Sequence, residues 1–188
     1  MVFYFLVTQV RKVLIVFKFY LLKIIYSTEL SSGSKFIFGS NFIISLVRNS
    51  SKIILGDNVV FRSNVSLRLN KNAVIQIGNN VFFNNSCSIN CLNNISIGSN
   101  CQFGEGVKFY DHNHNYRDKS RLINEQGYSI GSIAIGNNCW IGSNVVILKD
   151  VKIGENVVIG AGCVIYKSIP SNSLVTNNQN LTITSTKI

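Results

Sequence analysis

The chain has 188 residues, of which 46% are apolar and one is Pro, so its composition excludes a disordered chain and allows one domain with a real core. The formal net charge is +10, with the excess in the first half of the sequence. This charge suits an anionic membrane surface, an acidic polymer or a phosphate-bearing ligand. The sequence has no aromatic-basic stacking motif, which disfavours nucleic acid as a partner.

The first segment, residues 2–26, is apolar but is interrupted by basic residues. No apolar run reaches the roughly 18–20 residues of a membrane span, and no signal-peptide cleavage site follows. On a helical wheel the apolar residues share one arc, which predicts a basic amphipathic helix within residues 1–30. Such a helix either lies in a membrane interface or packs on the end of the domain or on partner subunits. The arc contains Val7, Val10, Val13, Leu14, Phe17, Tyr20, Leu21, Ile24 and Ile25, and the other half contains Thr8, Gln9, Arg11, Lys12, Lys18 and Lys23.

A repeat dominates the rest of the chain. From Ile135 to Pro170 an aliphatic residue recurs every six positions, a period that fits neither an α-helix nor a flat strand. A period of six indicates one short strand and one corner per repeat, stacked into a parallel β-helix. We therefore expect an all-β solenoid over residues 31–170, followed by a polar tail at 171–188.

A coil signature (aliphatic or aromatic residue, Gly, any residue, Asn) marks each turn of this solenoid. Successive signatures are 17, 22, 20, 38 and 18 residues apart, whereas three hexads make 18. The longer intervals predict small insertions near residues 73–76 and 95–96 and one extruded loop at about 115–132, on a functional face. The signatures start at Phe38, Leu55, Ile77, Ile97, Ile135 and Ile153.

The five Cys residues fit the interior of the solenoid. Cys87, Cys101, Cys139 and Cys163 occupy the inward, small-residue place of their hexads, which predicts packing rather than disulfide or metal roles. No CxxC pair is present, and free thiols suit a reducing cytoplasm.

Both His residues of the chain stand at the mouth of the extruded loop. The mouth reads FYDHNHNYRD and contains Asp111, His112 and His114. A zinc carbonic anhydrase of the β-helix type needs three His ligands, so the count of two His speaks against it, and ice-binding ranks of Thr are absent from the sequence.

These motifs resemble the hexapeptide-repeat acyltransferases, which have a left-handed parallel β-helix fold. The segments that carry the resemblance lie between Ile75 and Pro170 and include the loop with its two His residues, IAIGNNCWIGSNVVI and IGENVVIGAGCVIYKSIP. Within the family the chain is similar to the galactoside, maltose and nodulation acetyltransferases and to the O-acetyltransferases of bacterial capsule and O-antigen. It departs from them in its basic N-terminal segment and in VTNNQNLT near its end, where a Gly-Asn-Pro-Ala tail is common.

The resemblance implies acetyl transfer from acetyl-CoA to a sugar hydroxyl of a surface polysaccharide or its precursor, in a homotrimer with sites between subunits and without a metal. His114 would be the general base, and a neutral imidazole is suited to this near pH 7. Asp111 or Glu105 could orient the ring, and the Gly142 or Ser143 N–H could bind the oxyanion. An N-acetyltransferase of amino sugars and a non-catalytic scaffold remain alternatives. The other implied site residues are Asn84, Asp111 and His112 for the acceptor and Trp140, Gly142, Ser143, Ala161 and Lys167 for acetyl-CoA.

Overall fold

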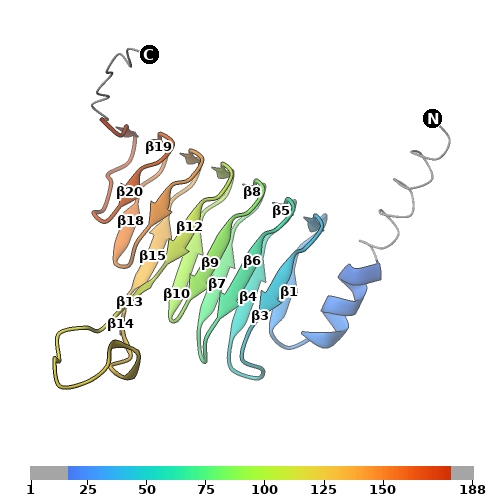
Figure 1. Cartoon of the computed structure of the whole chain (residues 1–188). Coiled ribbons are helices and arrows are strands. Elements are labelled where there is room, and N and C mark those ends of the chain that lie inside the picture. Colours follow the sequence, from blue (N-terminus) through green and yellow to red (C-terminus); the bar gives the residue numbers. More distant parts are fainter. Residues whose placement is uncertain (1–16, 179–188) are drawn as a thin grey trace, which may run out of the picture.

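The computed structural model describes residues 17–178, which form a parallel β-solenoid with an N-terminal helix at one end (Figure 1). Three parallel sheets run along its length and give each coil a triangular section. The first sheet contains β1 (Leu30–Ser32), β4 (Lys52–Leu55), β7 (Val74–Ile77), β10 (Asn94–Ile97), β15 (Ser132–Ile135) and β18 (Val151–Ile153). The second contains β2 (Ile37–Phe38), β5 (Val60–Phe61), β8 (Phe82–Phe83), β11 (Gln102–Phe103), β16 (Trp140–Ile141), β19 (Val158–Ile159) and β21 (Leu174–Val175). The third contains β3 (Ile43–Ser45), β6 (Ser66–Leu69), β9 (Ser88–Cys91), β12 (Lys108–Tyr110), β17 (Val146–Ile147) and β20 (Val164–Ile165).

The predicted parallel β-helix is thus confirmed, and its core follows from the hexads. The residue that opens each hexad points inward, and so does the small residue two places before it, because alternate residues of a strand face opposite sides. All five Cys residues are buried and unpaired, as the repeat predicts for four of them. A stack of aromatic rings fills the coils nearer the N-terminus, with centroids 4.8 Å apart for Phe61 and Phe83 and 4.6 Å apart for Phe83 and Phe103.

Asn residues turn many of the corners. Most non-Gly residues with positive φ in the described part of the chain are Asn, which tolerates the left-handed conformation better than other residues. Their side chains also bond from coil to coil, as in the chain of amides from Asn58 through Asn80 to Asn100, with N···O distances of 3.1 Å. The corner chemistry therefore stabilises the stacking as well as the turns.

The two small insertions lie a few residues earlier than we expected. Residues 74–77 and 94–97 are regular strands of the first sheet. The extra residues instead lengthen β6 and β9 to four residues each and enlarge the corners that follow them, at 70–73 and 92–93. The third sheet is therefore widest at these two coils, next to the coil that carries the extruded loop.

The N-terminal helix covers the open first coil. The face that packs on the coil is not the apolar arc of the helical wheel. Its described part covers residues 17–25, in which Phe19 and Leu22 pack against the core together with Tyr26, just beyond it. The arc residues of this part stay exposed, among them Phe17 at 66% and Ile24 at 74%. The helix is therefore apolar on both sides, and the remaining arc positions, 7–14, lie outside the described residues. Within residues 17–178 no helix is long and apolar enough to cross a membrane.

Candidate active site

The extruded segment leaves the solenoid between β12 and β15 as an antiparallel hairpin (Figure 1). Strands β13 (His112–His114) and β14 (Tyr128–Ile130) pair so that His114 lies opposite Tyr128. Beyond them a loop contains one short 3-10 helix, η1 (Ile123–Glu125). The loop is internally bonded, because the Gln126 amide donates to the carbonyls of Asp118 and Arg121 at 2.8 and 3.0 Å. Both His residues therefore stand on a paired strand, not on an irregular loop.

His114 is exposed on this hairpin and is held by a neighbouring ring. The centroids of His114 and Tyr128 are 4.5 Å apart, with the planes tilted by 48°. The imidazole opens into a hollow of about 640 Å³ between the hairpin, its loop and the corner after β17. Besides His114, the hollow is lined by Asn113, Asn115, Tyr116, Arg117, Asp118, Arg121, Gln126, Ser129 and Lys149. A base in this position meets solvent and any acceptor that enters the hollow.

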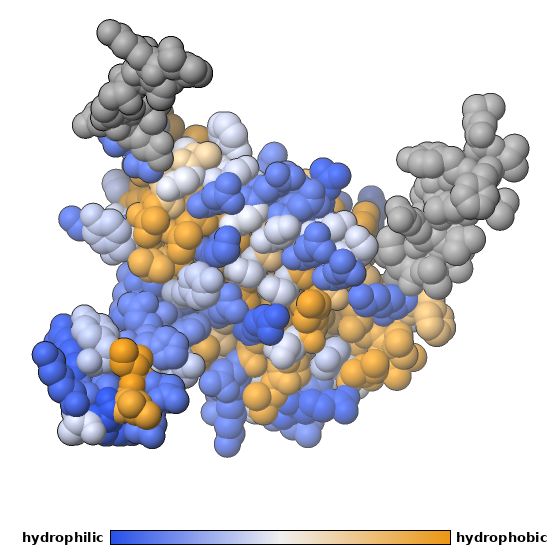
Figure 2. Space-filling view, in the orientation of Figure 1, coloured by the Kyte–Doolittle hydropathy of each residue, from blue (hydrophilic) through white to orange (hydrophobic). Residues whose placement is uncertain are grey.

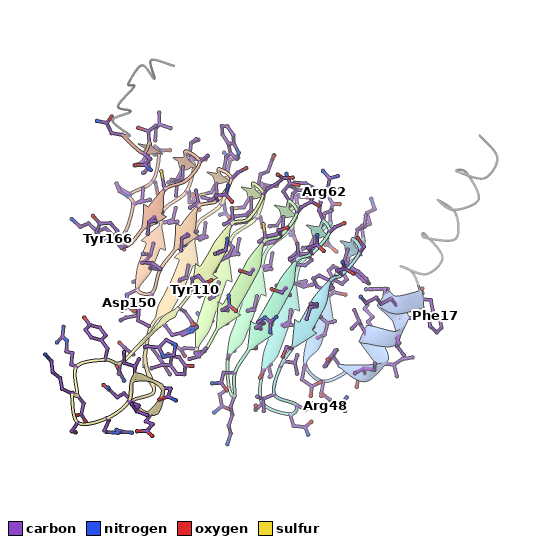
Figure 3. All side chains as sticks on the ribbon, viewed as in Figure 1. Phe17, Arg48, Arg62, Tyr110, Asp150 and Tyr166 are labelled. Atoms are coloured by element: carbon purple, nitrogen blue, oxygen red, sulfur yellow. The ribbon has the colours of Figure 1, made fainter. Side chains whose placement is uncertain are left out.

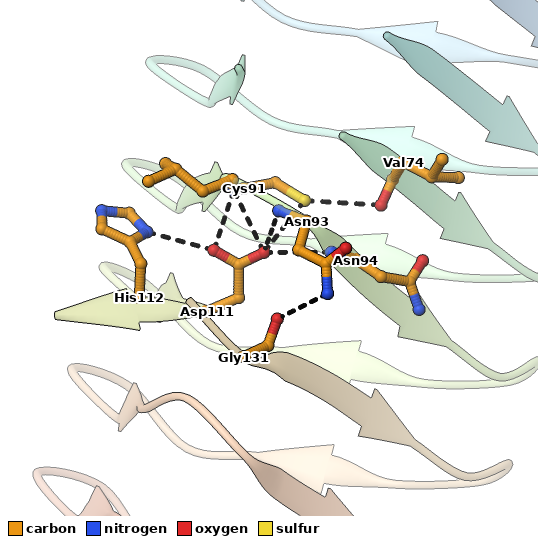
Figure 4. A network of polar contacts seen from close by, with 8 residues as sticks. Val74, Cys91, Asn93, Asn94, Asp111, His112 and Gly131 are labelled. Atoms are coloured by element: carbon orange, nitrogen blue, oxygen red, sulfur yellow. Dashed lines mark hydrogen bonds and ion pairs between the residues drawn. The ribbon is translucent and has the colours of Figure 1, made fainter. Parts of the chain in front are cut away.

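Asp111 is fully buried at the root of the hairpin (Figure 4). Its carboxylate accepts N–H bonds from Leu92, Asn93 and Asn94 at 2.8–3.1 Å, and the Cys91 thiol lies 3.3 Å away. The carboxylate is thus occupied within the chain, where the sequence predicted an acceptor contact. This geometry fits the other role the sequence allowed, that of orienting a His ring, although the ring is that of His112.

His112 is the ring that Asp111 holds. The Nδ1 atom lies 3.1 Å from the carboxylate, and the side chain is 15% exposed. A carboxylate only accepts, so Nδ1 carries the proton and Nε2 of a neutral ring remains an acceptor. The ring also meets Tyr128 edge-on at 5.2 Å, so Tyr128 touches both His residues.

Other predicted site residues gather at the corner between the second and third sheets. Asn84 follows β8, whereas Gly142 and Ser143 follow β16 and Ala161 follows β19. The corner is tightly stacked, since a Cβ on Gly142 would come within 2.6 Å of the Ala161 nitrogen.

Of the two N–H groups considered for the oxyanion, one is already used. The Gly142 N–H donates to the Ile159 carbonyl at 2.7 Å in the coil-to-coil ladder. The Ser143 N–H makes no hydrogen bond to another residue of the described chain. Ser143 is therefore the better donor at this corner.

Trp140 and Lys167 lie elsewhere. Trp140 is 59% exposed on the outer face of the second sheet, beside a hollow of about 370 Å³. Lys167 is exposed after β20, on the edge of the third sheet from which the hairpin leaves. Glu105 follows β11, at the corner between the second and third sheets, where it accepts a hydrogen bond from the Asn85 amide at 3.1 Å. In one chain it therefore reaches neither His.

The predicted site is therefore split between two edges of the third sheet, one at the carboxyl ends of its strands and the other at their amino ends. One edge carries His112, His114 and Lys167, and the other carries Asn84, Ser143 and Ala161. About seven residues of extended chain separate the edges, roughly 20 Å at about 3.3 Å per residue. A single chain does not bring the His and the corner together.

The sequence has clear relatives. The family profile described as bacterial transferase hexapeptide (six repeats) matches residues 132–167. One relative is 31% identical over 138 residues, which cover 69% of each chain. The chain thus belongs to the hexapeptide-repeat acetyltransferase family and is an acyltransferase. That relative is WbbJ of Escherichia coli K12, which is named for O-acetyl transfer in lipopolysaccharide biosynthesis. A Schizosaccharomyces pombe acetyltransferase, C18B11.09c, is 36% identical over 101 residues, or 53% of this chain and 47% of its own.

Solved structures show the same fold at low identity. A point mutant of the Bacillus cereus N-acyltransferase AntD, in complex with dTDP and coenzyme A, has a TM-score of 0.60 at 16% identity over 88% of each chain. The polySia-specific acetyltransferase NeuO has a TM-score of 0.51 at 20% identity, over 80% of this chain and 83% of its own. The Vibrio cholerae acetyltransferase VCA0836 with acetyl-CoA has a TM-score of 0.50 at 21% identity, over 75% and 66%. At these identities the likeness concerns the fold alone.

Two features of the site were missed in the sequence. Tyr128 lies fourteen residues after His114 and becomes its neighbour only through the hairpin register. The alternation of apolar and polar residues from Tyr128 to Ile130 was the one available sign of a strand there. The second is the use of the Gly142 N–H in the coil-to-coil ladder, for which the sign in the sequence was the stacking that the repeat implies.

Proposed function

We propose that the protein transfers an acetyl group from acetyl-CoA to a sugar hydroxyl of a bacterial surface polysaccharide or its precursor. The observation that carries this proposal is the exposed imidazole of His114, held by Tyr128 at the rim of an open hollow. The relationship to WbbJ, named for O-acetyl transfer in lipopolysaccharide biosynthesis, supports the choice of O-acetylation.

The residues suggest a direct mechanism. Neutral His114 removes the proton from the sugar hydroxyl as its oxygen attacks the thioester carbonyl, a step in which a positioned base contributes roughly 10²–10⁴ in rate. The Ser143 N–H donates to the tetrahedral oxyanion. Collapse expels the CoA thiolate, which takes the proton from His114 and leaves the sugar ester. None of the buried thiols is needed, because no covalent enzyme intermediate forms.

The separation of the two edges supports a homotrimer. In a trimer, the hairpin edge of one chain would face the Asn84 and Ser143 corner of the next. His114 would then come from one subunit, and the acetyl-CoA wall of Trp140, Ser143 and Ala161 would come from its neighbour.

The test of the base is His114→Ala, expressed in cells that lack the native gene. Mass spectrometry of the surface glycans should show acetyl groups with the native chain and none with the variant, while the purified variant still binds acetyl-CoA. The matched control is Leu122→Ala, an exposed residue of the same excursion that should retain transfer. Acetyl groups that mild alkali removes indicate esters, whereas resistant ones indicate amides and favour the amino-sugar alternative. Unchanged acetylation with His114→Ala would refute the proposed base.

A peripheral membrane contact is part of the same proposal. The helix presents Phe17, Tyr20 and Ile24 to solvent, and the space-filling view shows apolar surface at this end (Figures 2 and 3). Residues 1–28 carry four basic and no acidic side chains. An apolar face with basic residues fits the interface of an anionic bilayer on the cytoplasmic side.

Vesicle flotation tests this contact. The full chain should float with phosphatidylglycerol vesicles, and a Phe17→Ser, Tyr20→Ser, Ile24→Ser variant should float far less. A chain that starts near Ser31 provides a second comparison in cell fractionation. Equal flotation of the native chain and the triple variant would exclude the exposed face as the anchor.

A further inference from the structure

A row of polar side chains crosses the outer face of the third sheet. Residue pairs in register link Ser45 to Arg68, Arg68 to Asn90, and Asn90 to Tyr110, on four consecutive strands. Adjacent parallel strands lie about 4.8 Å apart, so these side chains form one continuous outward strip. The strip lies near the edge of the sheet from which the hairpin leaves.

The strip forms the floor of a hollow of about 270 Å³, which is separate from the one at His114. His112 and Tyr128 line it as well, together with Asn70. Tyr128 lines this hollow and contacts the ring of His114, which lines the other, so the two hollows lie on either side of the Tyr128–His114 contact. A chain of sugars could therefore occupy both at once.

The hollow carries a positive charge from the guanidinium of Arg68. No acidic side chain of residues 17–178 lies within salt-bridge distance of Arg68. The nearby carboxylate of Asp111 is buried and is occupied by backbone N–H groups and by Nδ1 of His112. The amide of Asn90 and the phenol of Tyr110 line the same hollow and add neutral hydrogen-bonding groups to it.

We infer that this hollow binds an acidic sugar of the acceptor glycan, next to the sugar that is acetylated at His114. A guanidinium donates two parallel N–H bonds to a carboxylate or phosphate, and the aromatic and amide groups can bind sugar faces and hydroxyls. The inference rests on the proposed function for the placement of the acetylated sugar, but the binding itself does not depend on catalysis.

The experiment is ligand-observed NMR on the full chain with three sugars. N-acetylneuraminic acid supplies a carboxylate, glucose 1-phosphate supplies a phosphate, and N-acetylglucosamine is uncharged. The variant is Arg68→Gln. The matched control is Arg62→Gln, which removes the same charge from an exposed position after β5, away from the strip (Figure 3). Mass photometry of each variant reports the oligomeric state.

At least one acidic sugar should bind the native chain more tightly than N-acetylglucosamine does. The Arg68→Gln change should weaken it about tenfold or more, and Arg62→Gln should not. Binding should persist in His114→Ala, so a failure of transfer would sink the proposed base and leave the subsite intact. Equal binding of acidic and neutral sugars, or no effect of Arg68→Gln, would overturn the subsite. A loss of oligomer in Arg68→Gln would instead make the strip a contact between copies, which also overturns it.

Discussion

His114 and Tyr128 face each other across the β13–β14 hairpin, with ring centroids 4.5 Å apart. The pair fixes the direction in which the exposed imidazole points, because one face of the ring is covered by the phenol. The ring of Tyr128 also contacts His112, with the two ring centroids 5.2 Å apart. Tyr128 therefore links the proposed base to the ring that Asp111 holds.

Two substitutions of Tyr128 should distinguish the contribution of its ring from that of its hydroxyl. Tyr128→Phe keeps the packing and should leave acetyl transfer within about twofold of the native rate. Tyr128→Ala frees the imidazole and should lower kcat by about 2–10-fold, the range that an aromatic contact of roughly 0.5–1.5 kcal/mol implies. Steady-state kinetics of both variants check this. A larger loss for Tyr128→Phe than for Tyr128→Ala would contradict a packing role.

Asp111→Asn should destabilise the root of the hairpin. One carboxylate oxygen becomes an NH₂ group that faces N–H donors, which leaves buried groups unsatisfied at a cost of about 1–3 kcal/mol. Chemical denaturation and hydrogen exchange at residues 92–94 measure the effect.

The control for this change is Asp118→Asn, in the exposed loop. Its carboxylate accepts from the Ser120 hydroxyl and N–H, which hold the pKa of Asp118 below its usual value. The asparagine keeps an acceptor oxygen there, so no change in denaturation is expected at neutral pH. If Asp118→Asn and Asp111→Asn behaved alike, the buried network would not be what holds the hairpin.

The aromatic stack offers a test of the core. Phe83 is fully buried between Phe61 and Phe103, so Phe83→Ala should cost about 3–5 kcal/mol of unfolding free energy. Phe83→Leu keeps most of the volume and should cost clearly less. Denaturant titration of the two variants measures the difference. A cost below about 1 kcal/mol for Phe83→Ala would mean that the stack does not support the solenoid.

The fold was predictable because the hexad repeat encodes the inside and the corners residue by residue. Cys139 and Val145 stand at equivalent places of successive hexads, and both are buried. Corner insertions shift this register without changing its pattern, so their positions near Asn70 and Leu92 could be placed only within a few residues. The inner face of the N-terminal helix was not predicted, because Phe19 and Leu22, which pack on the core, lie outside the apolar arc that the wheel selected.

The site was predictable only in part. The two His residues stood out because the chain has no others and both occur at the one long insertion. The burial of Asp111 and the contact of Tyr128 depend on long-range pairing, which local sequence does not encode. Placement of the predicted residues on two edges of one sheet likewise required the order of the strands.

Subunit complementation tests most directly the central claim that each site is shared by two chains. One chain carries His114→Ala, and the other carries Ala161→Trp, a bulky residue at an exposed corner that should block the acetyl-CoA wall. Each variant alone should be inactive. Mixed trimers purified with two different tags should recover about one third of the activity of a native trimer, because one of their three sites combines a native His with a native wall. If mixed trimers form and remain inactive, the His and the wall belong to the same chain and the account is contradicted.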